Sequence, residues 1–369
     1  MTRLLLASLL LVPALITGAD RRAKSIVLFL ADAGGIPTIN AASLHGYGAP
    51  RKLFLQRMPH VGLSDTSSAV HFVTDSAAGM TAIVTGQKTR NGFIAQSESG
   101  ERGVRDGVPL KTILEYAEER GLSTGIITND AVTGATPASL YAKANDRAST
   151  AVIFPQIFAP RFGDGVDVMI GAGRPAIAKA LAAAGLDLDA LARDSGRPLL
   201  AAIAEVAPDA KRAIVLYESA QFDLAQAMQV AVRVLSRNPK GYFLMVEWDT
   251  HTDNLRRGLD RMVELDRAIE QTAKDSKNTL LLFTADHSFD IRVRGGEAGR
   301  PLLEGFEEAE ARRVEEKRRD LRISAVRMDN GHTGEEVLVA AQGPGAERVH
   351  GYMANTDLFT VIMAAFGWK

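Results

Sequence analysis

The chain has 369 residues, of which 46% are hydrophobic and 24% charged, so it contains enough apolar material for a large buried core. Its 43 Lys and Arg residues balance 44 Asp and Glu residues, which excludes the basic excess of a nucleic-acid-binding surface. The lack of cysteine excludes disulfides, thiolate metal ligands and a lipid-anchored export signal, so any metal must be held by Asp, Glu, His and hydroxyl groups.

The first residues predict an export signal. Arg3 gives a positive start, Leu4–Ala14 form an apolar run, and small residues lead up to Ala19. The run is shorter than the ~20 apolar residues of a membrane-spanning helix. We therefore predict a signal peptide over residues 1–19, a mature domain over residues 20–369 without a membrane span, and a periplasmic or secreted location. An uncleaved anchor or a buried helix is the alternative.

Short apolar runs alternate with amphipathic helical patterns along the rest of the chain. Continuous apolar runs of this kind are typical of strands that are buried on both faces. The predicted strands are Ser25–Ala31, Gly125–Thr128, Val166–Ile170, Ala213–Tyr217, Tyr242–Val246, Thr279–Phe283 and Glu336–Ala341. The predicted helices are Lys111–Arg120, Asp223–Leu235, Leu255–Lys274, two short helices within Pro175–Ala207, and an exposed, charge-paired helix over Glu307–Arg322.

This alternation predicts the fold class. Strands that alternate with helices form a mostly parallel sheet with helices on both faces. We therefore expect an α/β protein, a three-layer αβα sandwich with a central, mostly parallel sheet. No sharp boundary divides the mature chain, which predicts a single catalytic domain.

Acidic residues and a histidine follow several predicted strands at the points where the strands end. In open α/β sheets, ligands bind beyond the carboxyl ends of the strands. A buried convergence of carboxylates is costly unless cations neutralise it, so the pattern predicts a polynuclear metal site at one edge of the sheet. The residues in these positions are Asp32, Glu247, Asp249, Asp286 and His287.

Histidines support the same interpretation. Imidazole together with carboxylate is the ligand set expected for zinc where no thiol is present. A single strand-end Asp is more often a helix cap and a single His is more often structural, so the argument depends on several such residues meeting. Three of the seven histidines lie beside acidic residues or glycine in suitable positions: His251, His287 and His332.

The segment Thr74–Ala82 contains a hydroxyl residue followed by small helix formers. Ser76 would then lie at a helix N-terminus, where the positive end of the helix dipole favours an alkoxide and binds phosphate oxygens. On this segment alone, a simple Ser or Asp N-cap is a slightly better explanation. Both interpretations stay open at this point.

Together these segments resemble the alkaline phosphatase family from Ile26 to about Phe359. The resemblance implies the fold of that family and the hydrolysis of phosphate monoesters through a phosphoserine intermediate. It also implies small phosphorylated substrates, and a homodimer is compatible with it. Six signatures occur in the family's order: Leu28–Gly35, Thr74–Ala82, Ala135–Ala138 with Arg147 after it, Val246–His251, Thr284–His287, and His332–Gly334 followed by Gly343–Gly345.

The resemblance further implies which residues act. Ser76 would be the nucleophile, and Arg147 would bind the phosphate through two parallel donors. Two zinc ions, about 3.5–4 Å apart, would clamp the attacking and leaving oxygens. One zinc would be held by Asp249, His251 and His332, and the other by Asp32, Asp286 and His287 with Ser76 Oγ. A magnesium ion would take the hard oxygen ligands Asp32, Thr136 and Glu247.

The sequence departs from the family pattern at two places. Asp249 and His251 are separated by one residue where most relatives have three, which leaves Asp253 as a rival carboxylate for the first zinc site. Gly134 stands where relatives commonly have Asp or His near the magnesium ion. Magnesium binding would then be weak, or the third site would be empty or hold another metal, unless Gly134 is an ordinary turn residue.

Other functions were weighed against monoester hydrolysis. A phosphodiesterase on the same fold is the closest alternative, but a bidentate Arg147 suits the free oxygens of a dianionic monoester better. A sulfatase is disfavoured because that chemistry usually relies on a modified cysteine. A non-catalytic phosphate- or metal-binding protein would need neither Ser76 nor Arg147.

Overall fold

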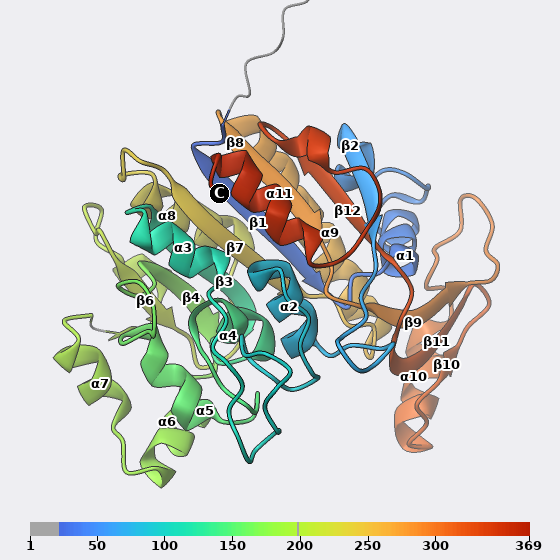
Figure 1. Ribbon diagram of the computed structural model, residues 1–369. Helices are drawn as coiled ribbons and strands as arrows, with labels where there is room; N and C mark the ends of the chain where they lie inside the picture. Colours follow the sequence, from blue (N-terminus) through green and yellow to red (C-terminus); the bar gives the residue numbers. More distant parts are fainter. Residues whose placement is uncertain (1–21, 198) are drawn as a thin grey trace, which may run out of the picture.

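A ten-stranded sheet crosses the centre of the protein in the computed structural model, which describes residues 22–197 and 199–369 (Figure 1). The strand order is β13-β2-β12-β8-β1-β7-β3-β4-β6-β5. All neighbouring pairs are parallel except those that β12 forms with β8 and β2. The strands are β1 (Ser25–Asp32), β2 (His60–Ser64), β3 (Ser123–Ala131), β4 (Val168–Ala172), β5 (Leu199–Leu200), β6 (Ala213–Leu216), β7 (Tyr242–Asp249), β8 (Thr279–Thr284), β12 (Val337–Gln342) and β13 (Gly351–Met353).

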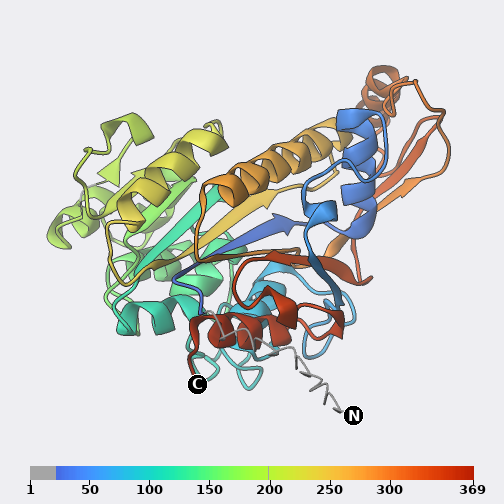
Figure 2. The same ribbon diagram turned by 90° about the horizontal axis from the view of Figure 1, so that it is seen from above.

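Helices cover both faces of this sheet, which confirms the predicted three-layer αβα arrangement (Figure 2). One face is covered by α1 (Ile36–Tyr47), α8 (Leu224–Leu235) and α9 (Leu255–Asp275). The other is covered by α2 (Ser76–Thr85), α3 (Ile113–Glu119), α4 (Ala135–Tyr141) and α11 (Asp357–Phe366), with α5 (Thr150–Ile153), α6 (Arg174–Ala183) and α7 (Leu188–Asp194) on the side of β4 and β6.

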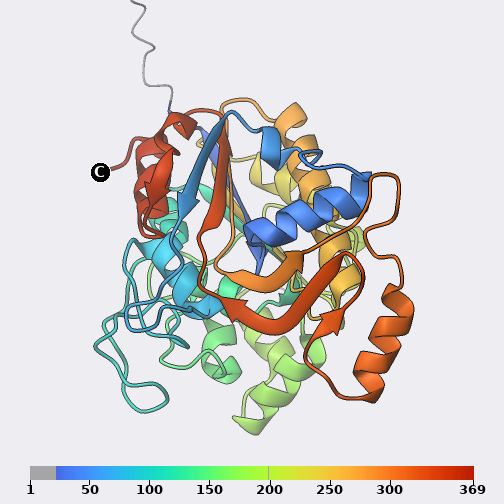
Figure 3. The same cartoon turned by 90° about the vertical axis from the view of Figure 1, so that its right-hand side faces the viewer.

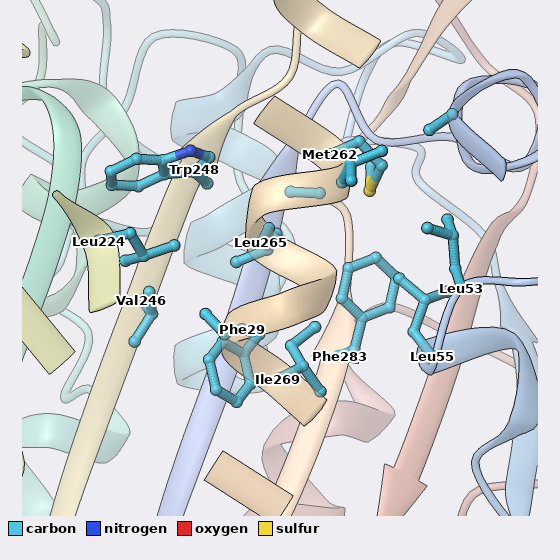
Figure 4. Close-up of a cluster of buried hydrophobic side chains, with 14 of the residues drawn as sticks. Phe29, Leu53, Leu55, Leu224, Val246, Trp248, Met262, Leu265, Ile269 and Phe283 are labelled. Atoms are coloured by element: carbon cyan, nitrogen blue, oxygen red, sulfur yellow. The ribbon is translucent and has the colours of Figure 1, made fainter. Parts of the chain in front are cut away.

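The central strand β1 shows why the sequence builds two cores. All its residues are buried, and successive side chains of a strand point to opposite faces. Phe29 therefore packs beneath α9 together with Phe283, Leu265 and Ile269, as Figure 4 shows. Its neighbour Leu28 belongs to the core on the other face. Burial on both faces requires the continuous apolar run from which the strand was predicted.

A second, three-stranded antiparallel sheet stands beside the main one, with order β10-β11-β9 (Figure 3). It consists of β9 (Ser288–Val293), β10 (Leu321–Arg322) and β11 (Val326–Thr333), with α10 (Phe306–Glu315) between β9 and β10. No strands were predicted here. The helix predicted over Glu307–Arg322 is wrong in its second half, because the chain leaves the helix near Lys317, whose φ is 52°, and buries Leu321 in the small sheet.

The predicted seven strands and the other predicted helices are confirmed, with end points that differ by a few residues. The predicted signal peptide, residues 1–19, lies outside the described residues. Within residues 22–197 and 199–369, no helix is long and apolar enough to cross a membrane.

Candidate metal centre and nucleophile

The carboxyl ends of three adjacent strands bring the acidic residues together. β1 lies between β7 and β8, and the register places Asp32 directly beside Asp249. Leu30 is paired with both Glu247 on β7 and Thr284 on β8, so Asp286 lies just past the end of β8 on the same edge. The sheet topology therefore delivers the carboxylates to one place, because parallel strands end at the same edge.

Ser76 meets this edge from helix α2. It is the first residue of the helix, and the N-cap is Asp75, whose carboxylate accepts from the Ala78 N–H at 3.0 Å. The buried Ser76 Oγ donates to Asp32 Oδ2 at 3.2 Å and lies 3.4 Å from His287 Nε2. Ser76 thus points into the carboxylate cluster, and the capping role belongs to its neighbour.

Gly79 allows α2 to approach so closely. A Cβ at this position would lie 3.0 Å from the Asp286 carbonyl oxygen and 3.1 Å from its Cβ. Both distances are shorter than nearly all ordinary contacts, so a side chain here would push the helix away from Asp286. The glycine in the third position after Ser76 therefore sets the distance between the serine and the end of β8.

The three candidate histidines are held in one common way. In each ring, Nδ1 contacts a fixed oxygen acceptor to which Nδ1–H donates, so Nε2 is the ring nitrogen that is available to a metal ion. The acceptors are Asp249 Oδ1 for His251 at 2.7 Å, the Ser288 carbonyl for His287 at 3.1 Å, and the Thr74 carbonyl for His332 at 3.3 Å.

Two overlapping groups of ligand atoms result, each with all atoms within 4.8 Å of one another. The first is His251, His287 and His332, and the second is Asp32, Asp286 and His287. Among the described residues, Asp32 Oδ1 and Asp286 Oδ2 are buried without a hydrogen bond and lie 3.5 and 3.4 Å from His287 Nε2, and the Nε2 atoms of His251 and His332 face each other at 3.3 Å. Two imidazole nitrogens at this distance need a proton or a metal cation between them, and the two buried carboxylate oxygens have no proton donor, so this set of ligand atoms fits bound metal ions.

Asp249 differs from the other predicted ligands in its contacts. One carboxylate oxygen accepts from His251 Nδ1, and the other accepts from Arg261 at 2.6 Å. Asp249 is in neither of the two groups. The rival Asp253 forms an ion pair with Arg257 at the exposed start of α9, whereas Asp249 lies beside His251. The geometry therefore favours Asp249 over Asp253 as the carboxylate that serves this histidine.

Burial and charge shift the proton affinities in the cluster. Burial and the charge of Asp32 raise the pKa of Asp286 to about 7. Burial lowers the pKa of His287. Burial opposes protonation of His251 as well, but the charge of Asp32 and the hydrogen bond to Asp249 raise its pKa to about 9. These shifts show crowded carboxylates without enough positive charge, which bound cations would supply.

A third set of oxygens lies between β7, β3 and α4. Glu247 is buried and accepts from the Thr128 hydroxyl across the strand pair. Burial and the charges of Asp32 and Asp130 raise the pKa of Glu247 well above its usual range. Thr136, in the first turn of α4, is also buried, and its hydroxyl faces Glu247 without meeting hydrogen-bond geometry to any group in the described residues.

Arg147 lies beside the start of α2. Its guanidinium contacts Asp75 Oδ2 at 3.2 Å, and its backbone N–H donates to the Gly92 carbonyl at 2.8 Å. About a third of the side chain is exposed, so the guanidinium is held in place yet open to a ligand at the helix N-terminus. The ten predicted residues therefore lie around one edge of the sheet, as the strand-end argument requires.

Several participating residues were missed at the sequence level. Asn129 accepts the Asp249 N–H at 2.7 Å, Arg261 pairs with Asp249, and Asp130 reaches Glu247 through its charge. Asn129 and Asp130 directly follow the predicted strand Gly125–Thr128, so the strand-end argument could have found them. Arg261 lies within α9, where it resembles any other solvated cation of an amphipathic helix.

The fold and the site define an α/β protein with a candidate metal centre beside a serine at a helix N-terminus. The sequence profile of the family described as alkaline phosphatase matches residues 23–207 and 200–302. The chain belongs to the alkaline phosphatase family, whose reaction is the hydrolysis of phosphate monoesters.

Curated relatives agree with this assignment. Streptomycin-6-phosphate phosphatase of Streptomyces griseus is 28% identical, with 97% of this chain and 94% of that protein covered. The alkaline phosphatase of Escherichia coli K12 is 28% identical, with 95% and 88% covered. The solved alkaline phosphatase of Thermus thermophilus has the same fold, with a TM-score of 0.78 at 22% identity over 97% of this chain and 96% of the other. For the enzyme of the Antarctic bacterium TAB5, the TM-score is 0.75 at 21% identity over 94% and 99%.

Proposed function

We propose that Ser76 is the nucleophile of this phosphomonoesterase. In the first step the bond from Ser76 Oγ to phosphorus forms, the ester bond to the leaving oxygen breaks, and Ser76 loses its proton. The leaving oxygen takes up a proton and departs as an alcohol. Water then attacks phosphorus and breaks the Oγ–P bond, which releases inorganic phosphate and restores the serine. The observation that carries the proposal is the buried Ser76 Oγ, 3.2 Å from Asp32 and at the first position of α2.

The protein's own groups prepare the phosphate site. The first-turn N–H groups of α2 and its dipole attract the negative oxygens of a phosphoryl group. Arg147, oriented by Asp75, can contact two phosphate oxygens at the same place. The hydrogen bond to Asp32 fixes the rotamer of Ser76, so Oγ is already directed at the substrate position.

We propose that two zinc ions complete the centre. His251 and His332, with Asp249 beside them, would hold one ion, and Asp32, Asp286 and His287 would hold the other with Ser76 Oγ. Because Asp249 contacts the Nδ1 side of His251, it also orients that imidazole. When bound, the two ions supply Lewis-acid stabilisation of the attacking and leaving oxygens. Asp32 Oδ1 and Asp286 Oδ2 have no hydrogen bond in the described residues and both lie near His287 Nε2, which supports a cation shared by these three atoms rather than a closed hydrogen-bond network.

We propose magnesium for the third set of oxygens. Asp32, Thr136 and Glu247 offer two carboxylates and a hydroxyl and no nitrogen, which suits a hard cation. The Thr136 hydroxyl is buried and lacks a hydrogen-bond partner, so an oxygen-binding ion would satisfy it. A buried hydroxyl is otherwise costly to leave unpaired.

We propose small phosphate monoesters as substrates, delivered outside the cytoplasm. A name such as streptomycin-6-phosphate phosphatase for one relative supports a small phosphorylated substrate. The signal-peptide pattern of residues 1–19 supports a periplasmic or secreted enzyme. The domain over residues 20–369 and a homodimer remain predictions that fractionation and size-exclusion chromatography would check.

The experiment is Ser76→Ala in zinc-loaded enzyme. We expect hydrolysis of p-nitrophenyl phosphate to fall by at least about a thousandfold, since the attacking atom is lost, and no phosphoenzyme to be trapped at acid pH. Metal content should stay near that of the wild type. The matched control is Ser43→Ala, a buried serine on α1 that binds the Ala49 carbonyl and should leave turnover intact.

Turnover by Ser76→Ala at the wild-type rate would exclude the serine as nucleophile. A comparison of phosphate monoester, diester and sulfate ester with wild-type enzyme tests the substrate class in the same assay. Faster hydrolysis of the diester would favour a phosphodiesterase and contradict the proposed use of Arg147.

A further inference from the structure

The third set of oxygens leaves coordination positions for water. Magnesium demands six oxygens in near-octahedral geometry and usually keeps several of its waters. Asp32, Thr136 and Glu247 provide three protein residues, so the remaining positions would be filled by water molecules. Such waters donate hydrogen bonds, and the site therefore needs an acceptor just outside the three ligands.

The sequence lacks an acceptor where relatives commonly carry one. Position 134 is Gly, two residues before Thr136, and offers no side chain. Its φ of −55° and ψ of 158° are open to any residue, so the backbone conformation does not require glycine. Glycine is therefore needed at position 134 because of the space around it.

Asp130 explains that requirement. A Cβ on residue 134 would lie 2.7 Å from Asp130 Oδ2 and 2.9 Å from the Ala131 carbonyl oxygen. Real Cβ atoms almost never approach so closely. The Ala131 carbonyl is backbone and can hardly move, whereas the Asp130 carboxylate is the end of a side chain and would be displaced from the space that a side chain on residue 134 would enter. The chain thus has a carboxylate next to the position of the missing one, supplied by the end of β3 instead of the start of α4.

At the end of β3, Thr128 connects the backbone of Asp130 with the buried Glu247 through two hydrogen bonds. The Asp130 N–H donates to the Thr128 hydroxyl at 2.9 Å, and that hydroxyl donates to Glu247. Asp130 is one of two carboxylates whose charge acts on Glu247, the other being Asp32. Asp130 is exposed and belongs to neither compact group of ligand atoms found in the described residues, whereas Glu247 is buried, so we place Asp130 on the solvent side of this set of oxygens.

From this arrangement we propose that Asp130 is the outer carboxylate of the third metal site, where it accepts hydrogen bonds from the waters of a magnesium ion held by Asp32, Thr136 and Glu247. The assignment rests on the proposed function. It explains why Gly134 is compatible with a third metal, because the glycine makes room for the relocated carboxylate. Asp130 is a positioning residue: it acts on the ion through water and does not touch the substrate.

The test measures magnesium binding directly. Zinc-loaded enzyme is titrated with MgCl₂ in a calorimeter, and zinc content is measured in the same samples. Asp130→Asn should weaken magnesium binding by about tenfold to a hundredfold, the usual effect of removing an outer-layer partner, with zinc content unchanged. The matched control is Asp209→Asn, which removes an exposed carboxylate in the loop before β6, at the opposite edge of the sheet.

A second pair of variants tests the shared space. Gly134→Ala should weaken magnesium binding in the wild-type background, because the new Cβ displaces the Asp130 carboxylate. In an Asp130→Ala background the same change should cost less, because only the contact with the Ala131 carbonyl remains, so the two losses should not add fully. Additive losses, or unchanged magnesium affinity in Asp130→Asn, would overturn the assignment.

Two further outcomes separate this inference from the proposed function. If Asp130→Asn weakens inhibition by inorganic phosphate but not magnesium binding, then Asp130 serves Arg147 and the inference is overturned. If wild-type enzyme forms the phosphoserine yet binds no magnesium, the inference fails alone. If magnesium binding depends on Asp130 while no phosphoserine forms, the nucleophile assignment fails and the metal assignment is supported.

Discussion

Glu118 offers a prediction about stability whose size follows from the structure. This residue of α3 is buried, and its carboxylate accepts from the N–H groups of Asp164 and Gly165 and from the Thr124 hydroxyl, all at 3.1 Å. Burial, together with the charges of Asp164 and Asp167, outweighs these hydrogen bonds and raises the pKa of Glu118 to about 7. The proposed change is Glu118→Gln, whose amide oxygen can accept from both N–H groups while its NH2 group donates to the Thr124 hydroxyl.

Whether a rise in pH stabilises or destabilises the protein depends on which state, folded or unfolded, loses the proton of Glu118 at the lower pH. Below pH 4.5, the ordinary pKa, the carboxyl is protonated in folded and unfolded chains alike, and its full contribution to stability is present. As the pH rises toward 7 the unfolded chain ionises first, so the folded state loses stability. The loss is complete above the folded-state pKa and amounts to about 3 kcal/mol. Gln does not ionise, so the variant should gain about this much relative to the wild type between acid and alkaline pH.

Urea unfolding at pH values from about 5 to about 9 measures this difference. The free energies of unfolding of variant and wild type should diverge as the pH rises from about 5 to the folded-state pKa of about 7, and the difference should stay constant above it. Glu101→Gln, in the exposed loop after α2, is the control for removal of a surface carboxylate. Parallel curves for Glu118→Gln and wild type would refute the reasoning, because they would mean that folding leaves the pKa of Glu118 unchanged.

Three other predictions concern the phosphate site, the metal site and the core. Arg147→Ala should weaken inhibition by inorganic phosphate by about tenfold to a hundredfold, as a charge-assisted pair is lost; empty zinc sites in this variant would show a structural role instead. His332→Ala should lower the zinc content by about one ion per chain, and an unchanged content, measured by elemental analysis, would exclude it as a ligand. Lys143→Met should lower the free energy of unfolding, measured in urea, by about 3–5 kcal/mol, because it leaves the buried Glu115 without a cation. In the wild type, Lys143 Nζ lies 2.8 Å from Glu115 Oε1. Adding Glu115→Gln should recover most of this loss, and a double variant as unstable as the single one would contradict the explanation.

The main sheet could be predicted because burial of its central strands on both faces leaves a clear pattern in the sequence. β1, β7 and β8 are buried on both faces, so the sequence of each is a continuous apolar run with polar residues at its end. The same feature located Asp32, Asp249 and Asp286, since strands that run in parallel finish at one edge. Fold and approximate site were thus accessible from local patterns.

The small sheet was not accessible in this way. β11 reads Val-Arg-Met-Asp-Asn-Gly-His-Thr and leaves about half of its residues exposed, so no apolar run marks it. β10 has only two residues, and the charge run before it favours a longer helix than forms. The position of Asp130 after a predicted strand could have been noticed, but its proposed role could not, because its closeness to Gly134 at the start of α4 is a contact distance that only the folded chain shows.

The strand order has a consequence for the time at which the enzyme becomes active. In the described part of the chain, β2 (His60–Ser64) pairs only with β12 and β13, and His332 lies on β11. Neither the pairing of β2 nor the histidine cluster can therefore form before the last part of the chain has been synthesised. A growing polypeptide that already contains Ser76 and Asp32 still lacks the imidazole of His332. In such a chain, β2 also has no strand to pair with. On the proposed metal assignment, catalysis would begin only when synthesis is almost complete, which would spare the phosphate esters of the compartment where the chain is made.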